Sequence, residues 1–136
     1  MSDQPASVVR EICLAHGQDR TRMMDIVREV QARLGSVSGS AMEIIAEATS
    51  TRRVDVEGVV SFYSFLSDQP KGNVVIRLCN DIIDRMHGGD RVATEFSRIL
   101  GIQFGQTTPD GKITLEYTPC IGMCDQAPAA LVNDVV

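Results

Sequence analysis

The stretch KITLEYTPCIGMCDQAPAALVN, residues 112 to 133, places two cysteines between two segments of strand-like composition. KITLEYT alternates polar and apolar residues and is rich in β-branched side chains, which is typical of a half-buried strand. It leads directly to Cys120 and Cys124, and AALVN follows them as a further strand candidate. Pro109-Asp110-Gly111 supplies a turn before the first strand. We therefore expect a strand, a cysteine loop and another strand.

The preceding stretch extends this pattern towards the N-terminus. NVVIRLC, residues 73 to 79, also alternates and predicts a strand that ends at Cys79. Gly88-Gly89-Asp90 then opens a helix, with Asp90 as the expected N-cap and Gly101 as the stop. The order strand, helix, strand, strand predicts a small α/β layer with helices packed against a short sheet.

The first half of the chain has helical periodicity instead. Apolar residues recur at helical spacing from Met23 to Leu34, where Gly35 supplies a stop. A second stripe follows Ser38-Gly39-Ser40, and we expect Asp55 to cap a further helix. Together with an amphipathic stretch around Cys13, these segments predict a compact helical bundle. Residues 67–72, SDQPKG, are expected to form a linker.

Two features of the helical half are ambiguous from the sequence. We expect Cys13 to be a buried free thiol and His16 to be a helix cap or a solvent contact. SFYSFL, residues 61 to 66, concentrates three of the aromatic residues of the chain. We expect part of this cluster to lie in the core, while the rest favours a docking patch for another subunit.

Charge and composition exclude several classes of function. The 136 residues carry a formal net charge of -5, which argues against nucleic acid or an anionic membrane surface as the main partner. No apolar run approaches the roughly 20 residues that a membrane-spanning helix needs, and the N-terminus lacks the pattern of a signal peptide. We expect a soluble, cytoplasmic protein, in which four cysteines are not disulfide staples.

Three cysteines then remain to be explained: Cys79, Cys120 and Cys124. Loops that leave the same end of neighbouring strands would bring these thiols together. A [2Fe-2S] cluster needs two ligands on each iron, usually four thiolates supplied as two pairs. Gly122 lets the backbone approach the cluster sulfides and donate hydrogen bonds to them.

The chain resembles a known family over nearly its whole length. The stretches that carry the resemblance are GSVSGSAMEIIAEA, VVSFYSFL, NVVIRLC and GIQFGQTTPDGKITLEYTPCIGMCDQAPAALVND. They are similar to the thioredoxin-like [2Fe-2S] subunit of the NADH-dehydrogenase module, found in respiratory complex I and in NAD(P)-linked hydrogenases and formate dehydrogenases. The resemblance implies an α+β fold: a helical bundle over residues 1–70 and a thioredoxin-like [2Fe-2S] ferredoxin domain over residues 71–136. That domain would lack its last strand and helix.

The resemblance also implies a cofactor and partners. The chain would bind one [2Fe-2S] cluster, while FMN and NAD(P) would lie on a flavoprotein partner subunit, with further iron–sulfur subunits in the complex. No nucleic acid and no direct membrane insertion are implied.

One departure from the family falls in the first ligand pair. The family has C-x4-C there, and this chain has CNDIID, so Cys79 is followed by Asp84 in the second position. The resemblance therefore implies the ligands Cys79, Asp84, Cys120 and Cys124. An ionised aspartate is a hard oxygen donor that preserves the charge of the missing thiolate. His87 and Asp81 are weaker alternatives, and the remaining reading is a decayed site in which Asp84 is a solvated loop residue.

Two functions follow, with no catalytic residues on this chain in either. The first is an electron-transfer subunit of an NAD(P)H-linked oxidoreductase, exchanging one electron between its cluster and the flavin of the partner. The second is a cluster-free structural subunit that supports the flavoprotein. A redox dithiol is a distant third, because the spacing of Cys120 and Cys124 is not C-x-x-C.

Overall fold

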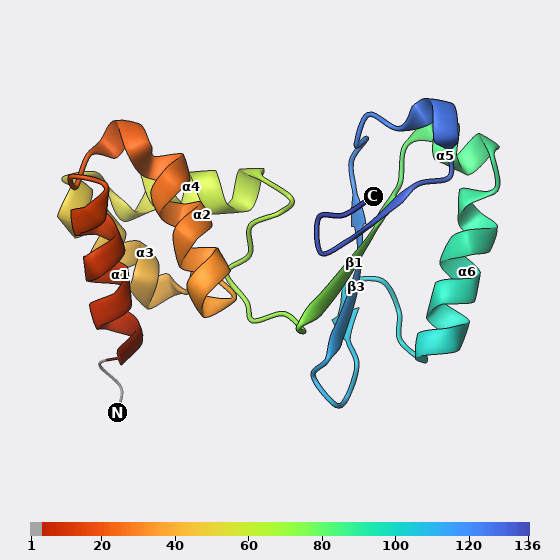
Figure 1. Ribbon diagram of the computed structural model, residues 1–136, viewed down its shortest axis with the longest axis horizontal. Helices are drawn as coiled ribbons and strands as arrows, with labels where there is room; N and C mark the ends of the chain where they lie inside the picture. The colour runs from red at the N-terminus through yellow and green to blue at the C-terminus, as the bar shows by residue number, and fades with distance from the viewer. Residues whose placement is uncertain (1–3) are drawn as a thin grey trace. The chain divides into compact units, whose positions relative to one another are not determined.

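The computed structural model of the protein describes residues 4–136, and the chain divides into two compact units. Unit 1 is Met1–Pro70 and unit 2 is Lys71–Val136. The first is all helical, and the second combines a sheet with helices, so the predicted α+β fold class is confirmed (Figure 1).

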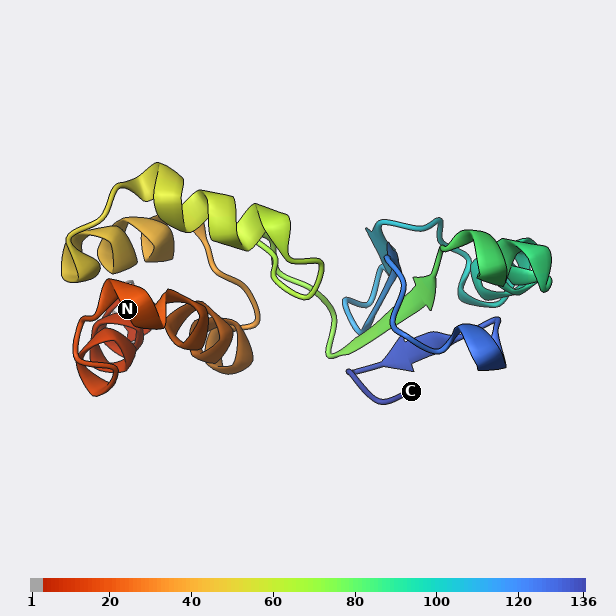
Figure 2. The ribbon, with the colours of Figure 1, turned by 90° about the horizontal axis from the view of Figure 1, so that it is seen from above.

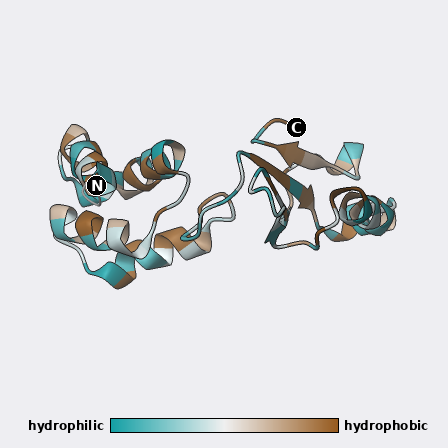
Figure 3. Ribbon diagram, turned by 90° about the horizontal axis from the view of Figure 1, so that it is seen from below, coloured by the Kyte–Doolittle hydropathy of each residue, from teal (hydrophilic) through white to brown (hydrophobic). Residues whose placement is uncertain are grey.

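Within residues 4–70, unit 1 consists of four α-helices and one short 3-10 helix. Their bounds are α1 Gln4–Ala15, η1 Arg20–Arg22, α2 Met23–Leu34, α3 Gly39–Thr49 and α4 Arg53–Phe62. Hydrophilic and hydrophobic residues alternate along these helices (Figure 3). Gly35 ends α2 in the left-handed conformation at φ 84°, and the Ser38 hydroxyl accepts the Ala41 N–H at the start of α3.

The helices of unit 1 share one apolar core. Its buried residues are Val9, Ile12, Cys13, Ile26, Val27, Val30, Val37, Ala41, Met42, Ile45, Ala46, Val56, Val60 and Leu66. Cys13 is 1% exposed, which confirms the prediction of a buried thiol. Burial of a thiol among apolar neighbours raises the pKa of Cys13.

One predicted detail of unit 1 is wrong. Asp55 is not the N-cap of α4; Arg52 occupies that position, and Asp55 sits three residues on, where its carboxylate accepts the Arg52 backbone N–H at 3.0 Å. His16 directly follows α1, and its backbone N–H donates to the Ile12 carbonyl at 3.2 Å, as expected of a residue that ends a helix. Its side chain, 16% exposed, contacts the Glu29 carboxylate on α2 at 2.7 Å, a contact between helices that spacing along the chain does not reveal.

The aromatic cluster of SFYSFL lies on the surface. Phe62 is 78% exposed, Tyr63 36% and Phe65 37%, so the expectation that part of the cluster lies in the core is wrong. The rings contact one another, with centroids 4.9 Å apart for Phe62–Tyr63 and 5.3 Å for Tyr63–Phe65. Leu66 is the residue of this stretch that enters the core.

Unit 2 is built on a four-stranded sheet in the order β2-β3-β1-β4. The strands are β1 Val74–Cys79, β2 Gln106–Thr107, β3 Ile113–Thr118 and β4 Ala130–Val132. β1 pairs with β3 in parallel, and β2 and β4 pair antiparallel at the two edges. The parallel pair requires a crossover, which α5 Ile82–Met86 and α6 Gly89–Leu100 supply on one side of the sheet (Figure 2).

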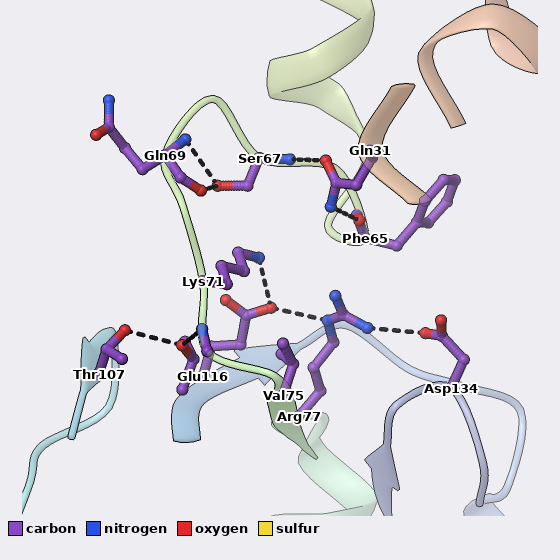
Figure 4. A network of polar contacts seen from close by, with 12 residues as sticks. Gln31, Phe65, Ser67, Gln69, Lys71, Val75, Arg77, Thr107, Glu116 and Asp134 are labelled. Atoms are coloured by element: carbon purple, nitrogen blue, oxygen red, sulfur yellow. Dashed lines mark hydrogen bonds and ion pairs between the residues drawn. The ribbon is translucent and has the colours of Figure 1, made fainter. Parts of the chain in front are cut away.

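The two faces of this sheet differ in character. On one face Ile76 and Leu115 pack with Phe96 and Leu100 of α6. On the other face the Arg77 guanidinium, whose side chain is 6% exposed, lies 2.8 Å from Glu116 and 2.8 Å from Asp134 (Figure 4). Unit 2 therefore buries charge within its sheet as well as apolar surface.

The segment between β1 and α6 differs from the prediction. Residues 82–86 form α5 where a loop was expected. Gly88, not Asp90, is the N-cap of α6, with φ at 90°. A Cβ on Gly89 would lie 2.8 Å from the Asp84 carbonyl oxygen, so the start of α6 packs directly against α5.

Within residues 4–136, no helix is both long enough and apolar enough to cross a membrane.

Candidate metal centre

The parallel pairing of β1 and β3 creates the site. Cys79, the last residue of β1, is in register with Thr118, the last residue of β3. The Asn80 N–H donates to the Thr118 carbonyl at 3.0 Å, and the Cys79 N–H donates to the Ala129 carbonyl at 3.0 Å. Because parallel strands end at the same edge of a sheet, the loops that follow β1 and β3 leave side by side.

The loop after β3 holds a close thiol pair. The Sγ atoms of Cys120 and Cys124 lie 3.4 Å apart, and Cys120 is exposed while Cys124 is half-buried. The Gly122 N–H points at the Cys120 sulfur at 3.4 Å, and Gly122 adopts φ 81°, where a side chain would be strained. The neighbouring Cys120 thiol, burial and the nearby carboxylates raise the pKa of Cys124 to about 11.

A carboxylate from the other loop completes a group of three donors. Ligand atoms of Asp81, Cys120 and Cys124 all lie within 4.8 Å of one another. Asp81 is the N-cap of α5, yet its side chain makes no capping hydrogen bond. Its Oδ2 instead accepts from the Cys124 thiol at 3.9 Å. Among the described residues, this is the group whose donors already converge.

Asp84 lies beneath this group in the interior of unit 2. It is 1% exposed, in the first turn of α5. Its Oδ1 accepts the Ala129 backbone N–H at 3.1 Å, while its Oδ2 is buried with no hydrogen-bond partner. Asp84 is therefore a buried residue and not a solvated loop residue, and its carboxylate neighbours the Cys79 thiol.

Cys79 is also buried, at 4% exposure. Its thiol donates to the Pro119 carbonyl at 3.7 Å. Burial raises the pKa of Cys79, and the adjacent Asp84 carboxylate adds to this effect. His87 lies elsewhere: it is exposed, and its Nδ1 is 2.8 Å from the Ile83 carbonyl of its own helix.

The structure thus brings together Asp81, Cys120 and Cys124 at the surface, with Cys79 and Asp84 buried. Three thiols and two carboxylates are donors that iron and zinc accept. Sequence reasoning treated Asp81 as a weaker alternative to Asp84, and the structure places the Asp81 carboxylate beside the cysteine pair. A helix predicted over residues 82–86 would have indicated this position, because the N-cap and first turn of one helix place Asp81 and Asp84 at the same end.

Comparisons with a family model and with individual proteins agree on the kind of protein that this chain is similar to. Residues 9–136 match the family described as thioredoxin-like [2Fe-2S] ferredoxin. The chain is 36% identical over 130 residues to the alpha subunit of the NAD-reducing hydrogenase HoxS of Cupriavidus necator, covering 96% of this chain and 22% of that one. It is 38% identical over 120 residues to one subunit of the NADH-quinone oxidoreductase of Pseudomonas aeruginosa, covering 88% of this chain and 72% of that one.

Among solved structures, an NAD+-reducing hydrogenase is again similar to this chain. The crystal structure of an NAD+-reducing [NiFe]-hydrogenase in the air-oxidised state matches with a TM-score of 0.70 and 25% identity, covering 82% of this chain and 19% of that one. The chain therefore spans about a fifth of the hydrogenase chains and most of the NADH-quinone oxidoreductase relative. With the family match over residues 9–136, we conclude that this protein belongs to the thioredoxin-like [2Fe-2S] ferredoxin family.

Proposed function

We propose that this chain is an electron-transfer subunit of a multisubunit NAD(P)H-linked oxidoreductase, exchanging one electron between a [2Fe-2S] cluster and the FMN of a flavoprotein partner. Membership of the family supports the cluster. The names of the relatives, an NADH-quinone oxidoreductase and an NAD-reducing hydrogenase, support the type of complex. FMN and NAD(P) would lie on the partner, and further iron–sulfur subunits would continue the electron path. The thiol-rich site suits a reducing compartment, the cytoplasm.

The proposed ligands are Cys79, Asp84, Cys120 and Cys124. The observation that carries this assignment is the buried Oδ2 of Asp84, which has no hydrogen-bond partner. A buried carboxylate oxygen without a partner is costly, and coordination to iron would remove that cost. The cluster supplies a one-electron carrier, and the chain's own groups orient it.

The neighbouring backbone has two roles at this site. The Ala129 N–H holds Oδ1 of Asp84, which leaves Oδ2 to face the metal. The Gly122 N–H is directed at the Cys120 sulfur, and such hydrogen bonds tune the electron density on a thiolate ligand.

A second candidate function is a structural subunit without a cluster. It is favoured by the engagement of the Cys79 thiol with the Pro119 carbonyl, since that donor already has a protein partner. The two candidates differ in one measurable property, the content of iron and sulfide.

The test is anaerobic purification of the full chain with iron and sulfide analysis and a visible spectrum. We expect a [2Fe-2S] spectrum in the wild type, loss or destabilisation in Asp84→Ala, and a more chelator-resistant cluster in Asp84→Cys, because thiolate is the softer donor. Asp125→Ala, an exposed carboxylate in the same region, is the control and should behave as wild type.

Two outcomes would overturn parts of the proposal. A fully loaded cluster whose stability is the same in both Asp84 variants would remove Asp84 from the ligand set. A folded chain without iron that still binds its partner would establish the structural function instead.

A further inference from the structure

Asp81 occupies a position that its local structure does not explain. An aspartate at a helix N-cap normally accepts backbone N–H groups of the first turn. Asp81 is the N-cap of α5 but makes no such bond, and its carboxylate turns towards Cys124. The Asp81 carboxylate therefore faces the cysteine pair and not the backbone of the helix.

Two of the distances among the three donors are close to those in the shell of a single metal ion. Zn²⁺ binds thiolates at about 2.3 Å and carboxylate oxygens at about 2.0–2.2 Å, so adjacent tetrahedral ligands lie roughly 3.6–3.8 Å apart. The sulfurs of Cys120 and Cys124 are 3.4 Å apart. The Cys124 sulfur is 3.9 Å from Oδ2 of Asp81. All three ligand atoms lie within 4.8 Å of one another.

The other two donors of the site are not arranged in this way. Asp84 and Cys79 are buried, and each is bonded to a backbone group, at Ala129 and Pro119 respectively. Cys120 is exposed and Asp81 is half-buried, so an ion from solvent reaches the surface group first.

We propose that Asp81, Cys120 and Cys124 form a mononuclear site for a thiophilic divalent cation, Zn²⁺ or Fe²⁺, in the cluster-free chain. A water molecule fills the fourth position. Two thiol protons are released to solvent on binding, and no electron is transferred. The site shares its cysteines with the proposed cluster but uses a different carboxylate, and it does not depend on Asp84. It allows the chain to hold one metal ion before a cluster is built.

The experiment titrates Co²⁺, as a spectroscopic substitute for Zn²⁺ and Fe²⁺, into the reduced, metal-free full chain under anaerobic conditions. We expect one Co²⁺ per chain, with the intense thiolate-to-cobalt absorption of a tetrahedral site. Loss of an outer hydrogen-bond partner of a metal ligand costs about 10–100-fold in affinity, so loss of a direct ligand in Asp81→Asn should cost at least about 10-fold. Asp125→Asn removes the same charge in the same region and should leave the affinity unchanged.

Two further variants separate this site from the cluster. Asp84→Asn and Cys79→Ser should bind Co²⁺ as the wild type does. The proposal is overturned if Asp81→Asn binds Co²⁺ as tightly as Asp125→Asn, or if Cys79→Ser loses as much affinity as Asp81→Asn. If substitution of Asp84 changes the stability of the cluster but Asp81→Asn does not change the affinity for Co²⁺, this proposal alone is wrong. If Asp81→Asn lowers the affinity for Co²⁺ but substitution of Asp84 does not change the stability of the cluster, the assignment of Asp84 as a cluster ligand alone is wrong.

Discussion

The two units of the chain use buried positions in opposite ways. The interior of unit 1 is one continuous apolar cluster drawn from all four α-helices. The apolar cluster of unit 2 is centred on Ile76, Ile102 and Leu115, and the same unit buries Arg77 and Asp84. Burial of apolar surface stabilises a fold, whereas burial of charge costs free energy unless partners are in place. Apolar burial therefore dominates the interior of unit 1. In unit 2, the burial of polar and charged groups offsets part of the free energy gained from apolar burial.

The largest effect expected from this comparison is in the ion network of unit 2. Oε1 of Glu116 accepts from Arg77 at 2.8 Å and from Lys71 at 2.9 Å, and all three side chains are less than 20% exposed. Removing one partner of a buried pair costs about 3–5 kcal/mol. Glu116→Ala leaves Lys71 without its carboxylate and leaves Arg77 with the exposed Asp134 as its remaining ion-pair partner. We therefore expect it to lower the stability of unit 2 by about that amount, measured by hydrogen exchange in β1 and β3 during urea titration.

Two matched variants test the cause of this loss. Asp134→Asn removes a partner of Arg77 whose side chain is 76% exposed, and it should cost about 1 kcal/mol or less. The triple variant Lys71→Met, Arg77→Met and Glu116→Leu should recover most of the loss, because it removes all three of these charges. Equal losses in Glu116→Ala and Asp134→Asn would contradict the role given to burial.

A slightly smaller effect is expected from the core of unit 1. Ile45 is fully buried in α3, and an Ile→Ala change at such a site costs about 2–5 kcal/mol. Ile45→Ala should therefore lower the urea midpoint of unit 1 and leave metal uptake by unit 2 unchanged. Leu14→Ala, at a side chain that is 65% exposed, is the control and should change stability by about 0.5 kcal/mol or less. Loss of metal binding in Ile45→Ala would show that the two units are not separable.

The comparison also explains which parts of the fold can be predicted from the sequence. The helices of unit 1 and strands β1 and β3 carry strong periodicity because each packs one face against an apolar core. α5 has five residues and β2 has two, and both are too short to establish a period. The aromatic cluster was misplaced for another reason: hydrophobicity indicates burial, but not whether the chain itself or a partner supplies it.

That exposed cluster leads to the third prediction. Phe62 is 78% exposed, so Phe62→Ala should leave the stability of unit 1 unchanged. Truncation of an aromatic anchor at an interface costs about 2 kcal/mol or more, which is roughly 30-fold in affinity. We expect that loss for the flavoprotein partner in a pull-down or titration, with wild-type binding retained at high salt. Leu14→Ala, also exposed and apolar, is the control. Dissociation by moderate salt alone would argue against apolar docking.

The candidate site was predictable only in part. The cysteines could be grouped because each follows a strand, and parallel pairing of β1 with β3 brings such residues to one edge. The roles of the two aspartates depend on α5, which turns Asp84 into the interior and leaves Asp81 at the surface. Spacing along the chain carries no information about that difference in depth.

The smallest expected effect concerns how helices begin in the two units. The Ser38 hydroxyl caps α3 by accepting the Ala41 N–H at 3.2 Å, whereas α6 starts at Gly88, which has no side chain to offer. Ser38→Ala should lower the stability of unit 1 by about 1 kcal/mol, because the N–H loses its acceptor, and Ser38→Gly by only a few tenths. Glycine leaves the N–H open to water, which replaces part of the lost bond. Hydrogen exchange at the first turn of α3 measures both variants against the wild type. If both variants lower the free energy of unfolding of unit 1 by about 1 kcal/mol or more, the loss comes from the backbone conformation at residue 38 and not from its hydroxyl. The way in which helices begin would then not distinguish the two units.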